Sequence, residues 1–452
     1  MKSINPANDK LIKEYAEYTP AEVQNIIKLV DKDWHSWRKT TFAERSGLMK
    51  KAAEILIKER DECAGIMTAE MGKIIKESRM EIEKCALGCI YYAENAERIL
   101  QDEIVETSYK KSFVGFDPLG TILVVMPWNF PFWQVFRFIA PGLMAGNAGV
   151  LKHASNVMGS ALKIEEILQK AGFPENLFRS LLISSSQVKA VIENPIVKAI
   201  SLTGSESAGS KVAETAGRQL KKLVLELGGS DPFIVLEDAN LEKCAQMAVT
   251  ARNLNCGQTC TAAKRFIIVE SVRAQFQELQ KKATEALMIG DPADETTQVA
   301  PMSRPDLMDE LHAQVEKSIQ MGAELITGGH KLDRPGNYYA PTILGNVKKG
   351  MPAYDEETFG PVAANIVVRN EEEAIAVAND TSYGLGASLW TRDLARGERL
   401  AREIESGMVF VNGITTSMPN MPFGGVKRSG YGRELADYGI KEFVNIKTIC
   451  IQ

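Results

Sequence analysis

The chain lacks several features that would place it in a specialised class. Its richest apolar stretch, residues 121–148, is interrupted by Pro127, Pro131 and Arg137, so no run is long enough to span a bilayer. The N-terminus has no apolar segment of the kind that a secretory signal needs. The 4 histidines stand singly and no Cys-x-x-Cys pair occurs. We therefore expect no bound metal and no Cys–His protease dyad.

Charge and cysteine content narrow the function classes further. A net charge of −5 shows no basic excess that would favour nucleic acid as a partner. The 7 cysteines are odd in number and follow no framework spacing, which predicts reduced thiols and a cytoplasmic location. A chain of 452 residues exceeds the size at which a single core keeps growing, so two or more domains are expected.

The order of predicted elements indicates an α/β fold. Residues from about 19 to 100 are expected to be helical, because capping boxes begin at Thr19 and Thr41. An extended segment is expected over residues 105–116, and the tail 443–452 alternates as an edge strand. Strands are predicted at residues 121–126, 149–152, 181–184, 197–203 and 223–227, and helices at residues 132–145, 157–170 and 206–218. This alternation favours a parallel sheet with helices on both faces, although the G-x-G-x-x-G fingerprint is absent.

A second α/β section is expected from about Asp231 to Gly413, and it contains a cysteine in a short polar loop, residues 255–262. Small and amide-bearing neighbours would leave the sulfur of Cys260 accessible, and nearby backbone N–H groups could hold an oxyanion. The alternative is a buried structural cysteine, so the loop alone does not decide between them.

Seven short motifs, taken together, resemble the aldehyde dehydrogenase superfamily over nearly the whole chain. They stand in the order and at the separations of that family: PWNFP (127–131), LKHAS (151–155), LTGS (202–205), LELGG (225–229), GQTC (257–260), EETFGPV (356–362) and PFGGVKRSGYGRE (422–434). The resemblance implies an α/β fold with a Rossmann-type parallel-sheet cofactor domain, an α/β catalytic domain and a β oligomerisation arm. It places the cofactor domain at 1–104 and 121–228, the catalytic domain at 229–424, the arm at 105–120 and 438–452, and a return to the cofactor domain at 425–437. Such arms pair subunits in the family, which implies a homodimer or homotetramer.

The resemblance also assigns catalytic roles. Cys260 would attack the aldehyde carbon to give a thiohemiacetal, whose oxyanion the Asn129 amide and the Cys260 backbone N–H would hold. After hydride transfer, Glu226 would activate the water that hydrolyses the resulting thioester.

The cofactor residues follow from the same motifs. The Gly204-Ser205 turn and the helix after it would face the pyrophosphate. Ser155 stands where NAD-preferring relatives often carry a glutamate, so NADP is expected to be accepted or preferred, with NAD also possible. The remaining residues implied at the cofactor are Lys152 at the adenosine ribose, Glu357 at the nicotinamide ribose, Phe359 against the ring and Trp128 in the same cleft.

Within the family the chain is similar to the succinate-semialdehyde dehydrogenase branch. Arg137 stands at the position of that branch's carboxylate-binding arginine; the alternative for Arg137 is a surface or interdomain salt bridge. Ser417 is a second candidate for the carboxylate, but Leu254 replaces an arginine that some members carry. Another ω-carboxy aldehyde or a medium-chain aliphatic aldehyde therefore stays open as the substrate.

Three other functions fit these residues less well. A CoA-acylating relative would generally lack the base at Glu226, and a cofactor-independent cysteine hydrolase would not need the nucleotide motifs. A non-catalytic binding protein would not need Asn129, Glu226 and Cys260 together. A disulfide between Cys256 and Cys260 requires an extended loop, so we expect no redox switch there.

Overall fold

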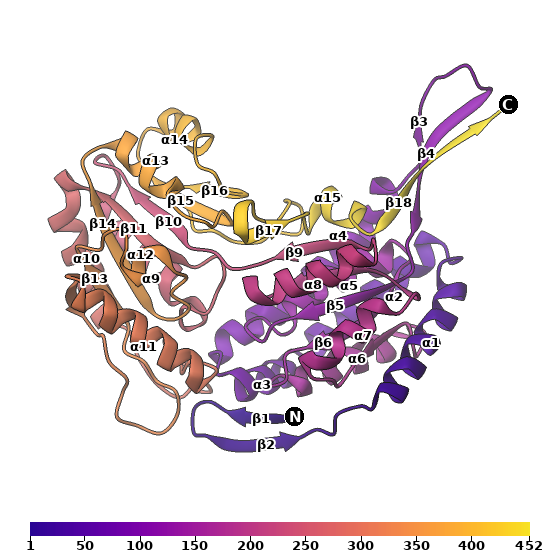
Figure 1. The fold of residues 1–452 in the computed structure, drawn as a ribbon, viewed down its shortest axis with the longest axis horizontal. Coiled ribbons are helices and arrows are strands. Elements are labelled where there is room, and N and C mark those ends of the chain that lie inside the picture. The colour runs from indigo at the N-terminus through magenta and orange to yellow at the C-terminus, as the bar shows by residue number, and fades with distance from the viewer.

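Two sheets rich in parallel pairs organise the computed structural model, which describes residues 1–452. Figure 1 shows the first sheet in one lobe, the second sheet in the other, and a narrow arm that projects from the first lobe. The first five strands of the first sheet precede the whole second sheet in the chain, and only β17 returns from the C-terminal part.

The first sheet has six strands whose buried, β-branched residues suit a sheet covered on both faces. Their order is β17 (Gly430–Tyr431), β9 (Lys222–Glu226), β8 (Val197–Thr203), β5 (Thr121–Met126), β6 (Ala148–His153) and β7 (Phe178–Ser180). All neighbours are parallel except β17 and β9. The connecting helices are α5 (Trp133–Met144), α6 (Met158–Ala171), α7 (Val188–Glu193) and α8 (Glu206–Arg218). These elements confirm most of the predicted strand–helix alternation.

The N-terminal region packs on this lobe as four helices after a hairpin. The elements are β1 (Lys2–Asn5), β2 (Lys10–Glu14), α1 (Pro20–Trp37), α2 (Phe42–Lys58), α3 (Arg60–Met71) and α4 (Ile75–Ile99). Both predicted capping boxes are present, with the Thr19 and Thr41 hydroxyls accepting from the backbone N–H of the third helical residue. The hairpin β1–β2 was not predicted.

The second sheet has seven strands, and only β12 runs antiparallel to its neighbour. The order is β12 (Glu324–Thr327), β13 (Thr342–Gly345), β14 (Val362–Val368), β11 (Ala263–Val269), β10 (Asp231–Val235), β15 (Gly386–Trp390) and β16 (Met408–Val411). Its helices are α9 (Leu241–Asn253), α10 (Arg273–Glu285), α11 (Pro305–Gln320), α12 (Pro352–Asp355), α13 (Glu371–Asn379) and α14 (Leu394–Ala401).

A three-stranded antiparallel sheet forms the arm, with the C-terminus near its tip (Figure 1). Its strands are β3 (Glu103–Ile104), β4 (Lys111–Pro118) and β18 (Val444–Ile451), and α15 (Ala436–Lys441) leads into the last one. The predicted tail strand is confirmed, because β18 pairs with β4 along its whole length. The prediction of a strand starting at residue 105 was wrong, since the chain between β3 and β4 turns back on itself before Lys111.

A second strand prediction was also wrong. Residues 181–184 are not a strand; the edge strand β7 ends at Ser180, whose ladder to β6 stops at Leu151. The apolar residues 181–183 are nevertheless buried, and the Leu181 N–H still donates to the Leu151 carbonyl at 2.7 Å, but the ladder does not continue beyond it. A short apolar run indicates burial but does not show which of its residues join a ladder. No helix in the structure has the length and apolar character that crossing a membrane requires.

Candidate active site

A cavity of about 660 Å³ is lined by segments that follow strands of both sheets. Seven of the predicted site residues border it: Trp128, Asn129, Gly204, Ser205, Cys260, Glu357 and Phe359. Glu226, Lys152, Ser155, Arg137 and Ser417 lie outside its lining. The cavity therefore brings the predicted nucleophile, one predicted oxyanion donor and part of the predicted cofactor site together.

The loop before Cys260 has an unusual backbone. Three consecutive residues, Asn255, Cys256 and Gly257, have φ of 52°, 54° and 72°, which reverses the chain between α9 and β11. A Cβ on Gly257 would lie 2.4 Å from the carbonyl oxygen of Gly360, so only glycine fits there. The buried Arg252 donates to the Gly257 carbonyl at 2.5 Å and holds the reversed turn in place.

Lys264 fixes the turn that carries the nucleophile. Its fully buried ammonium group donates to the carbonyls of Cys260 at 2.7 Å and Thr259 at 3.0 Å. The same nitrogen lies 3.4 Å from the carboxylate of Glu357, which ties the loop to the opposite wall of the cavity. Sequence reasoning did not single out Lys264, although it stands four residues after the nucleophile at the start of a buried strand.

The thiol of Cys260 is half-buried and protonated at neutral pH. Burial raises the pKa of the Cys260 thiol to about 11, while the positive charges of Arg137 and Lys264 act in the opposite direction. Because a thiolate is the reactive form, further positive charge or a base is needed to form it.

Asn129 keeps one amide hydrogen free. Its Nδ2 donates to the Gln258 carbonyl at 3.0 Å, and its Oδ1 accepts from Gln134 Nε2 at 3.0 Å. Asn255 Nδ2 donates to the Asn129 carbonyl at 2.8 Å, which fixes the backbone as well. A primary amide has two N–H hydrogens, so the second is available to an oxyanion beside Cys260.

Glu226 is buried at the end of β9, and neither of its carboxylate oxygens has a hydrogen-bond partner. A Cβ on Gly424 would lie 2.7 Å from Glu226 Oε1, so the side chain points toward Gly424. Burial, and then the charge of Glu434, raise the pKa of Glu226 well above its ordinary value, whereas the charge of Arg137 lowers it. In this position Glu226 lies outside the lining of the cavity.

Arg137 forms an ion pair, which is buried and does not lie at the surface as the alternative from the sequence allowed. Its Nε lies 2.7 Å from Glu434 Oε2, and both side chains are less than 5% exposed. Its Nη2 donates to Thr203 Oγ1 at 3.1 Å, and the guanidinium lies 4.5 Å from the centre of the Phe423 ring. Nη1 makes no hydrogen bond, and Nε is engaged through the ion pair alone, so the hydrogen bond to Thr203 is the one that the guanidinium makes.

The residues expected at the cofactor fit an anionic dinucleotide. Ser205 is the N-cap of α8, and its hydroxyl accepts from Ala208 N, so the helix N-terminus faces the cavity. Gly228 and Glu357 are in close contact, since a Cβ on Gly228 would lie 2.3 Å from Glu357 Oε2. Trp128 and Phe359 meet edge to face at 5.9 Å.

Lys152 lies in β6 and Ser155 follows that strand, and neither residue lines this cavity. Lys152 forms no ion pair, and burial lowers the pKa of its ammonium group, while Ser155 is exposed. A partly buried cation without a counter-ion suits a phosphate, and the uncharged hydroxyl of Ser155 does not repel one.

The loop after β16 brings Ser417 against two donors. Lys84 Nζ donates to Ser417 Oγ at 2.8 Å, and Trp133 Nε1 donates to the same oxygen at 2.9 Å. The sequence did not identify three further residues of the site, Lys84, Glu434 and Gln134. Each of them contacts a site residue that is distant in the chain or across the cavity.

Comparisons with known proteins identify the family. A model of the aldehyde dehydrogenase family matches residues 1–449. A Synechocystis sp. protein named "Probable succinate-semialdehyde dehydrogenase, NADP(+)" is 51% identical over 449 residues, which cover 99% of each chain. The NADP(+) succinate-semialdehyde dehydrogenase of Mycobacterium avium is 46% identical over 99% of this chain and 96% of that protein.

A solved structure shows that the fold is also shared with a succinic semialdehyde dehydrogenase. The succinic semialdehyde dehydrogenase of Streptococcus pyogenes, crystallised in complex with NADP+, superposes with a TM-score of 0.98 and is 39% identical. The match covers 100% of this chain and 99% of that one. With the family model spanning nearly every residue and a cysteine, an amide donor and a helix N-terminus arranged around one cavity, the chain belongs to the aldehyde dehydrogenase family.

Proposed function

We propose that the protein oxidises succinate semialdehyde to succinate, with NADP as the preferred hydride acceptor and NAD as a weaker one. The observation that carries the proposal is the placement of Cys260 and the free amide hydrogen of Asn129 on one cavity wall. The names of the relatives at 46–51% identity support the substrate. Oxidation of another ω-carboxy or medium-chain aliphatic aldehyde is the second candidate, because Arg137 is engaged with Glu434.

In this mechanism the Cys260 thiol gives its proton to water in the cavity and attacks the aldehyde carbon as the thiolate. The charge that develops on oxygen is held by Asn129 Nδ2 and the Cys260 backbone N–H. Bound NADP would supply the hydride acceptor that converts the thiohemiacetal into a thioester. Glu226 then takes a proton from the hydrolytic water. This step requires its side chain to turn from Gly424 toward the cavity, which the next residues of the chain, Leu227 and Gly228, already border.

For the cofactor, the N-terminus of α8 with Ser205 would bind the pyrophosphate, and Glu357 and Phe359 would hold the nicotinamide end. Lys152 would pair with a 2′-phosphate, and Ser155 would leave room for it. The preference for NADP rests on the free charge of Lys152 and on the NADP+ bound by the Streptococcus pyogenes protein.

For the distal carboxylate, the proposed ligands are the Ser417 hydroxyl and the Nη1 of Arg137. The anchor is expected to be electrostatic, because a substrate with two ends of different polarity is oriented by fixing its charged end.

We also propose a homodimer or homotetramer built through the arm. The proposed domains are a cofactor domain (1–104, 121–228 and 425–437), a catalytic domain (229–424) and the arm (105–120 and 438–452). The arm exposes apolar side chains, including Ile104, Ile446 and Ile451, and one edge of β18 has no partner strand. The edge of β16 in the second sheet is likewise open. Open edges and exposed apolar strands of this kind are typical of surfaces that another chain covers.

Initial rates with succinate semialdehyde and with hexanal, each with NADP and with NAD, test the function. A higher kcat/KM for succinate semialdehyde with NADP is the expected result. Equal or faster oxidation of hexanal would overturn the substrate, and no reduced nucleotide with any aldehyde would overturn the activity.

A further inference from the structure

We infer that Lys84 determines the specificity of the enzyme: its ammonium group binds the distal carboxylate of the aldehyde together with Ser417. The inference rests on the proposed function, because it concerns the charged end of the same substrate.

Lys84 is a half-buried cation without an anionic partner. Its Nζ donates to Ser417 Oγ at 2.8 Å and lies 4.7 Å from the centre of the Trp133 ring, and it takes part in no ion pair. The contrast with Lys73 is informative, because that fully buried lysine pairs with Glu81. A charge withdrawn from water without a counter-ion is costly, so the surroundings of Lys84 favour a bound anion.

The charges around Lys84 strengthen this preference. Burial lowers the pKa of the Lys84 ammonium group to about 8, and the positive charge of Arg137 on α5 acts in the same direction, with Lys73 adding a smaller effect. The carboxylate of Glu81 opposes the shift but is already shared with Lys73. The Lys84 ammonium group therefore lacks a paired anion and is repelled by the charge of Arg137, and a carboxylate bound beside Lys84 would relieve both effects.

The hydrogen bonds of Ser417 leave one donor for this carboxylate. Ser417 Oγ accepts from Lys84 Nζ and from Trp133 Nε1, so both of its lone pairs are engaged. A serine hydroxyl has two acceptor lone pairs and one hydrogen, and that hydrogen therefore remains free to be donated. A carboxylate has only acceptors and matches the free O–H of Ser417 and the N–H groups of Lys84.

The cluster also lies beside the reacting end of the site. Trp133 is the first residue of α5, and the next residue, Gln134, borders the cavity that contains Cys260. Glu81 on α4 accepts from the backbone N–H groups of Phe132 and Trp133 at 2.9 Å each, which holds this turn against the helix that carries Lys84. The position of the cluster is consequently fixed relative to the oxyanion donor Asn129, to which Gln134 is bonded.

Arg137 is less free to take this role than Lys84. The guanidinium is shared between Glu434 and Thr203, whereas the single hydrogen bond of Lys84 is to a neutral hydroxyl. We therefore assign the stronger contact with the carboxylate to Lys84, and Nη1 of Arg137 remains a second, weaker ligand.

The test compares Lys84→Met and Lys84→Arg with the wild type in kcat/KM for succinate semialdehyde and for butanal, which lacks the carboxylate. Loss of a charge-assisted hydrogen bond should lower the ratio of the two values by about 10- to 100-fold in Lys84→Met, mainly through KM. Lys84→Arg should restore most of the ratio because it keeps the charge. An unchanged ratio in Lys84→Met, with a wild type that prefers succinate semialdehyde, overturns the role of Lys84 and leaves the proposed function intact. A wild type without that preference overturns the proposed function itself.

A second measurement does not depend on turnover. Acetylation of the wild-type enzyme by acetic anhydride, followed by mass spectrometry, should show Lys84 protected by succinate and not by the neutral succinamide. The exposed Lys28 and Lys50 provide matched control lysines whose labelling succinate should leave unchanged. Equal labelling of Lys84 with and without succinate contradicts the inference even if the variant proteins fold poorly.

Discussion

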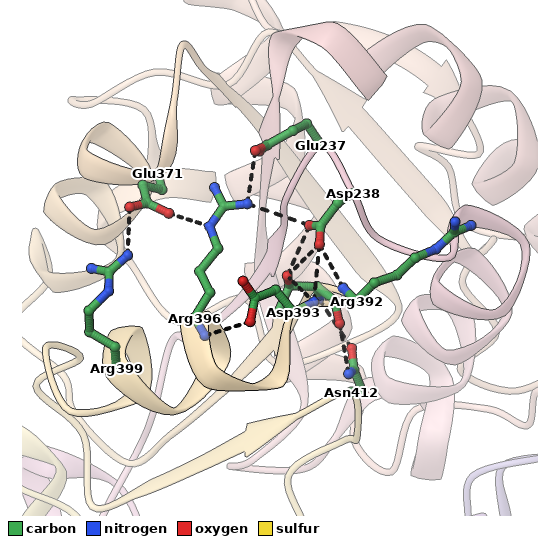
Figure 2. Close-up of polar contacts among 9 residues, drawn as sticks. Glu237, Asp238, Glu371, Arg392, Asp393, Arg396, Arg399 and Asn412 are labelled. Atoms are coloured by element: carbon green, nitrogen blue, oxygen red, sulfur yellow. Dashed lines mark hydrogen bonds and ion pairs between the residues drawn. The ribbon is translucent and has the colours of Figure 1, made fainter.

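Two groups of charged side chains in this molecule are built in opposite ways. The buried group beside the cavity consists of Arg137, Glu226 and Glu434, where one cation serves two carboxylates and both oxygens of Glu226 lack partners. The surface network on the second lobe, shown in Figure 2, joins Glu237, Asp238, Glu371, Arg392, Asp393, Arg396, Arg399 and Asn412.

The two groups differ in whether each carboxylate has a partner of opposite charge. Arg396 contacts Glu237 at 2.8 Å and also pairs with Glu371, which receives a second bond from Arg399 at 2.8 Å. Hydrogen bonds from these arginines lower the pKa of Glu371, whereas burial and a like charge raise the pKa of Glu226. The surface network is satisfied and holds loops and helices together, while the buried group retains a carboxyl group without hydrogen-bond partners. The comparison predicts that changes in the buried group affect chemistry first and that changes in the network affect only stability.

The largest effect is expected from removing the thiol on which the buried charges act. Cys260→Ala should lower kcat by at least about 10⁴-fold, because no other group in the cavity can form the covalent intermediate. The thermal midpoint should change little, since the side chain is small and half-buried. The exposed Cys450→Ser is the matched control and should keep wild-type rates. Retained activity in Cys260→Ala would remove the nucleophile from the proposal.

The next largest effect is expected from Glu226→Gln. Loss of the general base should slow the steady-state rate by about 10³-fold and leave a burst of reduced cofactor close to one per active site, because only thioester hydrolysis is blocked. Mass spectrometry should detect the acyl adduct on Cys260. In the wild type this hydrolysis should accelerate as pH rises through the raised pKa of Glu226, since the base works only when deprotonated. Absence of a burst together with slow turnover would place Glu226 before hydride transfer instead.

The sequence allowed the elements around the site to be predicted because their signals are local. The helix 206–218 was placed to the residue, since Ser205 supplies an N-cap and the β8 strand before it is a buried apolar run. The motifs also identified Cys260 and Asn129, which the structure places on one cavity. The sequence could not indicate which side chains pair across the fold. Arg137 pairs with Glu434, and Lys84 donates to Ser417. Both contacts depend on the tertiary packing of segments that are far apart in the chain. The edge strand β7 was misplaced for a related reason, because burial and ladder pairing have the same apolar pattern.

A smaller effect, on stability, is expected from breaking the buried ion pair of Arg137 and Glu434. Arg137→Leu should lower the free energy of unfolding by about 3–5 kcal/mol, because Glu434 would be left buried without a counter-charge. The double variant Arg137→Leu with Glu434→Gln should recover much of this loss, since neither partner then carries a charge. Urea denaturation of the single and double variants measures both values. Equal losses in the two proteins would show that shape, and not charge, is what Arg137 contributes.

The smallest effect is expected in the surface network. Arg396→Met should cost roughly 1 kcal/mol, because partly exposed ion pairs are screened by water and salt, and kcat should stay at the wild-type value. Added salt should narrow the difference between the two proteins, whereas it should leave the cost of Arg137→Leu nearly unchanged.

The pKa values of Glu371 and Asp238 are lowered in the folded protein, so the contribution of the network is present above their unfolded pKa values and is lost as pH falls through the folded ones. Urea midpoints at neutral and acidic pH should therefore converge for Arg396→Met and wild type on the acidic side. A difference that persists in acid and in high salt would mean that Arg396 acts by packing, and the contrast between the two groups of charges would then no longer rest on pairing.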